Sequence, residues 1–283
     1  MSRRGSRWTT DKPPFGAAEV DRNHPLGEGV VAHWVMNEGT GQLYSMPGSL
    51  VSSPSTAMSG VFVVEQGRLC TKFTGDPQHV NFGNQAPLNI TGPFTLIGWC
   101  RRNSALAYNV PITRRGGSGG SQLQYQLTWL HSGETPANGV RLDWRTGGNL
   151  RTLNSTSAYT TSAWHQLAAT YDLATARLFV QGLQDGSASV SGAVDTFSVN
   201  NYLGQDGDVT PNYSVALFDN VSIYRTALIP ANIQWLYAEP YAFLRPKVPR
   251  RYFVPAAAAP TGTIRPRRGV LRGVGTGLLG GVG

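Results

Sequence analysis

The chain has 283 residues, of which 14% are charged, and a formal net charge of +8 at pH 7. Abundant glycine (34) and proline (18) indicate many tight turns, which favours a turn-rich β protein and disfavours helical bundles and doubly wound folds. No segment contains the roughly 18 consecutive apolar residues that a membrane span requires, so no membrane partner is expected.

The positive charge is concentrated at the two ends of the chain. Residues 238–283 carry eight basic residues and one acidic residue, and residues 1–23 carry five basic and three acidic ones. Residues 24–237 are nearly neutral, with eleven basic and twelve acidic residues. Together with Pro13-Pro14 and the proline- and glycine-rich end, this distribution predicts three parts. They are an extended N-terminal arm (1–23), a globular domain (24–237) and a basic C-terminal arm (238–283).

Short apolar or alternating runs recur along the central region and are separated by turn residues. Strands are expected over residues 29–36, 61–64, 68–73, 94–101, 123–130, 140–144, 164–171, 176–181 and 216–224. A short helix is expected over 230–237, because Pro230 suits the first helical turn. Ile233, Leu236 and Tyr237 then share one face of this helix. Strands that recur roughly every 10 to 15 residues predict an all-β sandwich or jelly roll.

The chain has two cysteines, Cys70 and Cys100, and their pattern demands no bond between them. A disulfide and two buried free thiols are both open, and the second is favoured. The basic start Met1-Ser2-Arg3-Arg4 is not followed by an apolar run, so no secretory signal is expected. The protein is therefore expected to be made in a cytoplasm.

A series of short motifs follows in a fixed order through the central region. It consists of residues 24–26 (HPL), 29–34 (GVVAHW), 37–41 (NEGTG), 73–75 (FTG), 93–99 (PFTLIGW), 164–172 (WHQLAATYD), 177–182 (RLFVQG) and 218–228 (FDNVSIYRTAL). The series resembles LamG-like jelly-roll domains of the concanavalin A-like lectin/glucanase superfamily. This resemblance implies a concanavalin A-like two-sheet jelly-roll sandwich over residues 24–237. It implies little about activity, because the fold hosts lectins, hydrolases and structural modules.

The end of the domain extends the resemblance. The stretch 236–241 (LYAEPY), followed by the arginine- and proline-rich residues 245–253, is similar to LamG-like proteins of tailed bacteriophages. Those proteins are taken to be virion components. The similarity implies a non-enzymatic virion structural protein, such as a capsid decoration or tail-associated subunit. It would be made in the host cytoplasm and reside in the virion.

Glycoside hydrolysis on this fold requires two carboxylates about 5 to 9 Å apart. The resemblance implies that a catalytic strand would carry the pattern Glu-x-Asp-x-x-Glu, and this pattern does not occur in the chain. The acidic residues of the central region are scattered along it. The sequence therefore predicts that the protein is not an enzyme.

A polar loop contains Asp206 and Asp208, whose carboxylates are of the kind that calcium prefers, with Asp76 as a further candidate. A solvated turn without metal is the favoured alternative. No cofactor is therefore predicted, and calcium binding stays open.

Sugar binding is the second functional hypothesis. Lectins with this fold stack a sugar ring on an exposed aromatic side chain and hold it with Asn or Asp side chains. Four tyrosines close to predicted loops are candidates: Tyr108, Tyr159, Tyr202 and Tyr213. A β protein of this size also exposes some tyrosines without function.

The C-terminal arm is the leading candidate for a partner-binding segment. Its aromatic and basic residues are Tyr241, Phe243, Arg245, Lys247, Arg250, Arg251, Tyr252, Phe253, Arg265, Arg267, Arg268 and Arg272. We expect the arm to order on a neighbouring copy or another virion protein, with the aromatic rings as anchors. A solubilising tail and contact with nucleic-acid phosphates are the alternatives, and nucleic acid is the less favoured of the two.

Overall fold

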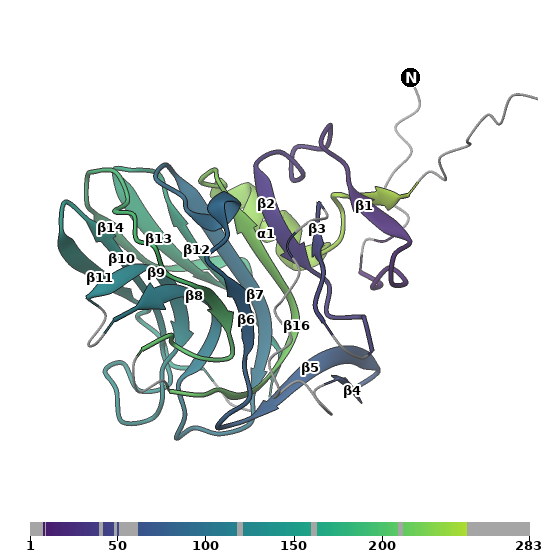
Figure 1. The fold of residues 1–283 in the computed structure, drawn as a ribbon, viewed down its shortest axis with the longest axis horizontal. Helices are drawn as coiled ribbons and strands as arrows, with labels where there is room; N and C mark the ends of the chain where they lie inside the picture. The colour runs from purple at the N-terminus through teal and green to yellow at the C-terminus, as the bar shows by residue number, and fades with distance from the viewer. Residues whose placement is uncertain are drawn as a thin grey trace, which may run out of the picture. The chain divides into compact units, whose positions relative to one another are not determined.

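The computed structural model describes residues 8, 10–39, 42–47, 50, 62–117, 121–159, 163–208 and 212–247. Most of the strands that these residues form belong to two antiparallel sheets that lie face to face (Figure 1). The all-β jelly-roll sandwich predicted from the sequence is confirmed.

The strands of the described residues fall into three sheets. The six-stranded sheet has the order β11 (Asn149–Asn154), β10 (Val140–Thr146), β9 (Gln122–Trp129), β8 (Asn109–Gly116), β15 (Asn201–Leu203), β6 (Val80–Gly83). The main path of the second sheet is β14 (Leu183–Ser189), β13 (Thr175–Val180), β12 (His165–Tyr171), β7 (Phe94–Arg102), β16 (Val215–Tyr224), β2 (Val30–Trp34), β3 (Ser45–Met46). This nine-stranded sheet also includes β5 (Arg68–Thr74) beside β16 and β4 (Phe62–Glu65) beside β5. The third sheet pairs β1 (Ala18–Val20) with β17 (Leu244–Pro246).

The described residues include two helices, η1 (Ala86–Leu88) and α1 (Pro230–Ala238). The predicted helix over 230–237 is therefore confirmed as α1. Ile233 and Leu236 are buried as expected, but Tyr237 is 38% exposed and its ring stacks on Trp99 at the sheet surface. None of the helices described is long and apolar enough to cross a membrane.

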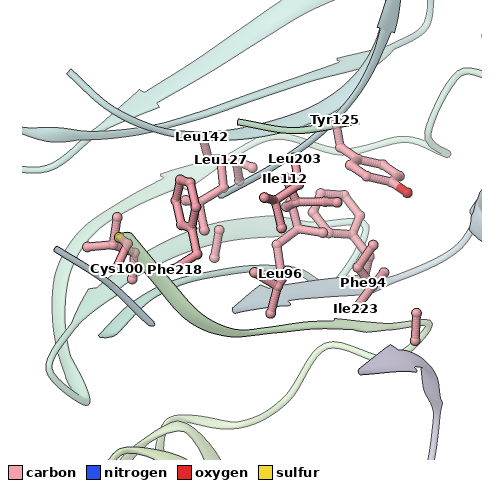
Figure 2. Close-up of a cluster of buried hydrophobic side chains, with 14 of the residues drawn as sticks. Phe94, Leu96, Cys100, Ile112, Tyr125, Leu127, Leu142, Leu203, Phe218 and Ile223 are labelled. Carbon is pink, nitrogen blue, oxygen red and sulfur yellow. The ribbon is translucent and has the colours of Figure 1, made fainter. Parts of the chain in front are cut away.

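The main core fills the space between the two large sheets. Figure 2 shows Leu127 and Leu142 of the six-stranded sheet directed toward Leu96 and Phe218 of the nine-stranded sheet. All four side chains are almost fully buried. Because successive side chains of a strand point to opposite faces, only alternate residues of each strand enter this core.

A second core covers the outer face of the nine-stranded sheet. Ile97 of β7 and Ala168 of β12 belong to it, whereas their neighbours Leu96 and Leu167 belong to the main core. Helix α1 contributes Ile233 and Leu236 to the same cluster. A sheet covered on both faces favours strands that are apolar on both faces, which explains the nearly continuous apolar run of β7.

The hairpin of β12 and β13 is determined by local chemistry. The carboxylate of Asp172 accepts hydrogen bonds from the backbone N–H groups of Ala174 (3.0 Å) and Thr175 (2.6 Å), which closes the turn. On the two strands, Leu167 pairs with Val180 and Tyr171 with Ala176. The predicted strands 164–171 and 176–181 match these elements.

Residues 10–23 of the predicted N-terminal arm and residues 238–247 of the predicted C-terminal arm fold onto the domain, so the folded unit extends past the predicted boundaries at 23 and 237. Strand β1 lies within the predicted N-terminal arm and pairs with β17 of the predicted C-terminal arm. Val20, Tyr241 and Phe243 are buried in the second core. Covering the apolar outer face of the sheet removes these side chains from water, which is the physical reason for the difference. One compact unit extends to Lys247, and the rest of the predicted C-terminal arm lies outside the described residues.

The two cysteines are free thiols and both are buried. Cys100 belongs to the main core, whereas the Cys70 thiol contacts the carbonyl oxygen of Val63 in the neighbouring strand β4 (3.6 Å). Burial raises the pKa of both thiols, and that of Cys70 reaches about 11. Of the two alternatives left by the sequence, the structure has two buried free thiols.

Candidate functional site

A continuous row of polar side chains crosses the outer face of the six-stranded sheet. Directly opposed residues on neighbouring strands lie on the same face, so the strand register identifies its members. The row, from β6 to β11, consists of Asn81, Tyr202, Thr113, Gln126, Asp143 and Thr152. We call these six residues the polar row.

The middle of the polar row is a hydrogen-bonded ladder. Thr113 Oγ1 donates to Gln126 Oε1 (3.1 Å), and Gln126 Nε2 donates to Thr128 Oγ1 (2.8 Å). Thr152 Oγ1 donates to Asp143 Oδ1 (2.7 Å), and Arg141 Nε lies 2.9 Å from Asp143 Oδ2. Burial raises the pKa of Asp143, while Arg141 and Thr152 oppose this shift. The ladder therefore holds its polar groups in fixed positions.

Three aromatic rings gather at the β6 end of the polar row. The His79 ring lies 5.9 Å from the ring centroid of Tyr202 and 5.9 Å from that of Tyr213. All three side chains are partly exposed, and Asp76 beside them is exposed. Burial and the negative charge of Asp76 raise the pKa of Tyr213. We call Tyr202, His79 and Tyr213 the aromatic group.

The backbone of the loop after β15 approaches the aromatic group closely. Gly207 has a φ of +73°, and a Cβ at this position would lie 2.8 Å from the carbonyl oxygen of Arg115 and 3.0 Å from the Tyr202 ring. A side chain there would be strained by both the dihedral angle and the contact. Glycine thus allows the loop to support Tyr202.

Of the four predicted sugar-binding tyrosines, the structure brings two together. Tyr202 and Tyr213 share the His79 ring as a neighbour. Tyr108 instead donates its hydroxyl to Glu134 and packs against His131. Tyr159 donates to Asp185 and packs against the main core. These last two hydroxyls are engaged in separate structural contacts.

His79, which is central to the aromatic group, was not predicted from the sequence. A weak signal was available, because His79 lies two residues before Asn81 and alternation places both on the same face of the chain. Its neighbours Tyr202 and Tyr213, however, are more than a hundred residues away in sequence. Only the pairing of β6 with β15 brings these residues together.

The calcium candidates Asp206 and Asp208 have protein partners. The Asp206 carboxylate accepts the backbone N–H of Asn212 (3.0 Å) and its side-chain amide (2.7 Å). The Arg115 guanidinium lies 3.6 Å from Asp206 and also contacts Asp208. Within the described part of the chain, no group of three or more His, Cys, Asp or Glu side chains is placed to hold a metal ion. The positive charge beside the Asp206 and Asp208 carboxylates thus comes from Arg115. Asp206 is only 5% exposed, so it caps a buried turn, whereas the favoured alternative from the sequence was a solvated turn.

The predicted partner-binding residues divide into three sets. Tyr241 and Phe243 are only 2% and 0% exposed, so they anchor their own segment to the domain instead of facing a neighbour. Arg245 is exposed at the surface and pairs with Glu19 (2.9 Å), and Lys247 follows it at the end of the described chain. The remaining candidates lie outside the described residues: Arg250, Arg251, Tyr252, Phe253, Arg265, Arg267, Arg268 and Arg272.

Comparison with known proteins identifies the family of the central region. A sequence model of the "Concanavalin A-like lectin/glucanases superfamily" matches residues 74–234, more than half of the chain. Among curated proteins, none matches the sequence significantly.

Several solved structures share the fold at low sequence identity. The binding domain of Paraclostridial Mosquitocidal Protein 1 has a TM-score of 0.59 and 12% identity, covering 75% of this chain and 52% of that one. The binding domain of botulinum neurotoxin serotype G has a TM-score of 0.55 and 9% identity, covering 74% and 50%. A structure of botulinum neurotoxin type C has a TM-score of 0.53 and 10% identity, covering 74% and 51%. The chain thus spans about half the length of these structures, and the likeness shows the fold alone.

Proposed function

The chain belongs to the concanavalin A-like lectin/glucanases superfamily, and from this premise we propose that it acts as a non-catalytic carbohydrate-binding module. The observation that carries the proposal is the aromatic group at the end of the polar row. Tyr202 and Tyr213 flank His79 at the sheet edge, with the exposed Asp76 carboxylate beside them.

The aromatic group has the chemistry that a sugar requires. An aromatic face packs against the C–H groups of a pyranose ring, and nearby carboxylate and amide groups bond its hydroxyls. The Asp76 carboxylate offers hydrogen-bond acceptors. The side-chain amide of Asn200 offers a donor and an acceptor, and its Nδ2 donates to the Tyr202 hydroxyl (3.2 Å). Cell entry of the structurally similar botulinum neurotoxin type C is dependent upon interaction with two ganglioside molecules, which supports a glycan as the ligand class.

The carboxylate of the polar row is poorly suited to catalysis. Asp143 is held by Arg141 and Thr152, so its oxygens are committed to protein partners. A hydrolase needs a second carboxylate within about 5 to 9 Å on the other side of the scissile bond. The missing Glu-x-Asp-x-x-Glu pattern supports the proposal of a binding function without hydrolysis.

A glycan array probed with the full chain tests this function, with and without a calcium chelator. We expect saturable binding that does not require calcium, because Arg115 engages both Asp206 and Asp208. Tyr213→Ala should weaken binding roughly tenfold through loss of ring contact. Tyr237→Ala, which removes another partly exposed tyrosine, is the matched control and should leave binding unchanged. Equal effects of the two variants, or no glycan binding at all, would contradict the proposal.

We propose as a second function that the protein is a virion structural subunit, such as a capsid decoration or tail-associated protein, as the sequence resemblance implies. The β1–β17 pair supports this role, because it holds residues 244–246, shortly before the segment 248–283 in sequence, on the domain. Arginine is the only charged residue type in that segment, which also carries Tyr252 and Phe253. Such a segment could order on a neighbouring virion protein or a second copy of the chain.

Truncation after Lys247 tests the assembly role. Removal of more than this would strip Tyr241, Phe243 and Leu244 from the second core and unfold the outer layer. The truncated chain should keep its fold but lose incorporation into particles and change its mass in solution. A second variant of the full chain replaces only four arginines by Gln: Arg265, Arg267, Arg268 and Arg272. It separates the contribution of positive charge to assembly from that of the aromatic residues Tyr252 and Phe253. Unchanged assembly of the truncated chain would contradict the role.

A further inference from the structure

A cavity of about 510 Å³ is lined by residues 10–15, by residues 67–69 at the start of β5, and by Asn37, Asp219 and Tyr241. Its charged lining residues are Asp11, Lys12, Arg68 and Asp219. Phe15 forms part of its wall. Ligand sites for small molecules have volumes of about 300 to 1,000 Å³, so the cavity has a suitable size.

Residues 10–15 are held over the cavity by partly buried hydrogen bonds. Lys12 Nζ donates to the carbonyl oxygens of Leu69 (2.5 Å) and Asp219 (2.9 Å) and pairs with the Asp219 carboxylate. The side-chain amide of Asn37 donates to the carbonyl oxygen of Pro13 (2.5 Å). Burial lowers the pKa of Lys12, and the Asp219 charge opposes this shift. The cavity wall is therefore a built part of the domain.

Arg68 is oriented from two sides. Its Nη1 donates to Asp219 Oδ2 (3.0 Å), and its guanidinium lies 5.5 Å from the Trp99 ring centroid and 6.0 Å from that of Trp164. A guanidinium held by a carboxylate and by aromatic rings is pre-organised, so little conformational entropy is lost when it donates to a ligand.

The lining charges cancel, since two cationic and two anionic side chains face the cavity. An ionic ligand therefore gains no net attraction, whereas a ligand whose groups both donate and accept can use both signs. Hydroxyl groups have this property. Phe15 is 57% exposed and packs beside Tyr44, with ring centroids 5.9 Å apart, so an apolar ring surface is available at the wall.

We propose that this cavity is a second binding site, for a neutral saccharide, separate from the aromatic group. The ligand class rests on the proposed carbohydrate-binding function, and the site itself rests on the cavity and its lining. Arg68 begins strand β5, and Asp76 follows the end of this seven-residue strand, which places the two sites roughly 20 Å apart.

Site-resolved NMR titration of the full chain tests the proposal. The probes are maltose, cellobiose, lactose and N,N′-diacetylchitobiose, with glucuronic acid as the charged comparison. We expect a neutral disaccharide to shift the backbone amide signals of Asp11, Lys12 and Arg68 saturably. Phe15→Ala should weaken this binding roughly tenfold. Leu106→Ala is the control, because Leu106 is 84% exposed and does not line the cavity, and it should leave the binding unchanged.

The variants separate this proposal from the function proposed above. Tyr213→Ala should weaken the saccharide binding reported by shifts near Tyr202 roughly tenfold and leave that reported at Asp11 and Arg68 unchanged, which would support a distinct second site. Saccharide shifts confined to the aromatic group would overturn the second site and leave the proposed function standing. Shifts at Asp11 and Arg68 produced by glucuronic acid alone would overturn the neutral ligand class.

Discussion

Glu19 and Arg245 face each other across the β1–β17 pair although 226 positions separate them in sequence. Arg245 Nε donates to Glu19 Oε1 at 2.9 Å. The ion pair is exposed, so it contributes little to stability by itself. Its importance is that it marks where the two ends of the folded unit meet.

The apolar residues beside this strand pair should carry the stability of the outer layer. Phe243 is fully buried, and its ring lies 5.0 Å from that of His33. Phe243→Ala should lower the free energy of unfolding by about 3 to 5 kcal/mol through lost burial and a cavity. Arg245→Ala should change it by about 1 kcal/mol or less. Chemical denaturation measures both, and similar values for the two variants would show that this segment does not pack on the domain.

Stability should depend on pH through His33. Burial lowers its pKa to about 3 from an ordinary value of 6.5, and the positive charge of Lys12 adds to the shift. Because the folded pKa is the lower one, the unfolded chain binds more protons between these values. This contribution to stability is fully present above pH 6.5 and is lost as the pH falls toward 3, with a slope of about 1.4 kcal/mol per pH unit.

A comparison with His33→Asn isolates this term from the carboxylates, which titrate in the same range. Asparagine retains a polar group near Ser222 Oγ, which lies 2.8 Å from His33 Nδ1. Between pH 6.5 and 4 the wild-type chain should lose more unfolding free energy than the variant. Parallel curves for the two proteins would contradict a buried neutral histidine.

The two thiols should be unreactive in the folded protein. Both are buried, and burial raises the pKa of Cys70 to about 11, so the thiolate is scarce at neutral pH. Ellman's reagent should detect almost no thiol in the native chain and two in denaturant. Rapid modification of one cysteine without denaturant would show that a path to solvent opens at that position.

Gly207 should be required for the shape of the aromatic group. Gly207→Ala adds a Cβ that would lie 2.8 Å from the carbonyl oxygen of Arg115 at a φ of +73°. Gly148→Ala is the matched control, because Gly148 has a φ of +76° but nothing within 4 Å of its Cβ position. Both variants should lose about 1 kcal/mol or more from the dihedral strain. Only Gly207→Ala should also weaken glycan binding, and equal binding by the two would contradict the role given to this loop.

Local patterns determined much of the sandwich. Strand β7 was predictable from its continuous apolar run, the β12–β13 hairpin from alternation and Asp172, and α1 from Pro230. These signals depend on residues close together in sequence, so each can be evaluated without the rest of the chain. Polar edge strands such as β14 escaped prediction, because an edge strand exposed to water needs no apolar pattern.

Tertiary structure alone decided that Tyr241 and Phe243 are buried and which residues make up the site. The prolines and arginines around Tyr241 and Phe243 have the composition of an extended arm, yet both rings are buried in the second core. Likewise, Tyr202 and Tyr213 were no better candidates than Tyr108 and Tyr159 until strand pairing placed His79 between them. The sequence alone determined the strands that have a clear local pattern, such as β7, β12 and β13. Which distant side chains share a face depends on the register of those strands, and register is set by the packing of the whole sheet.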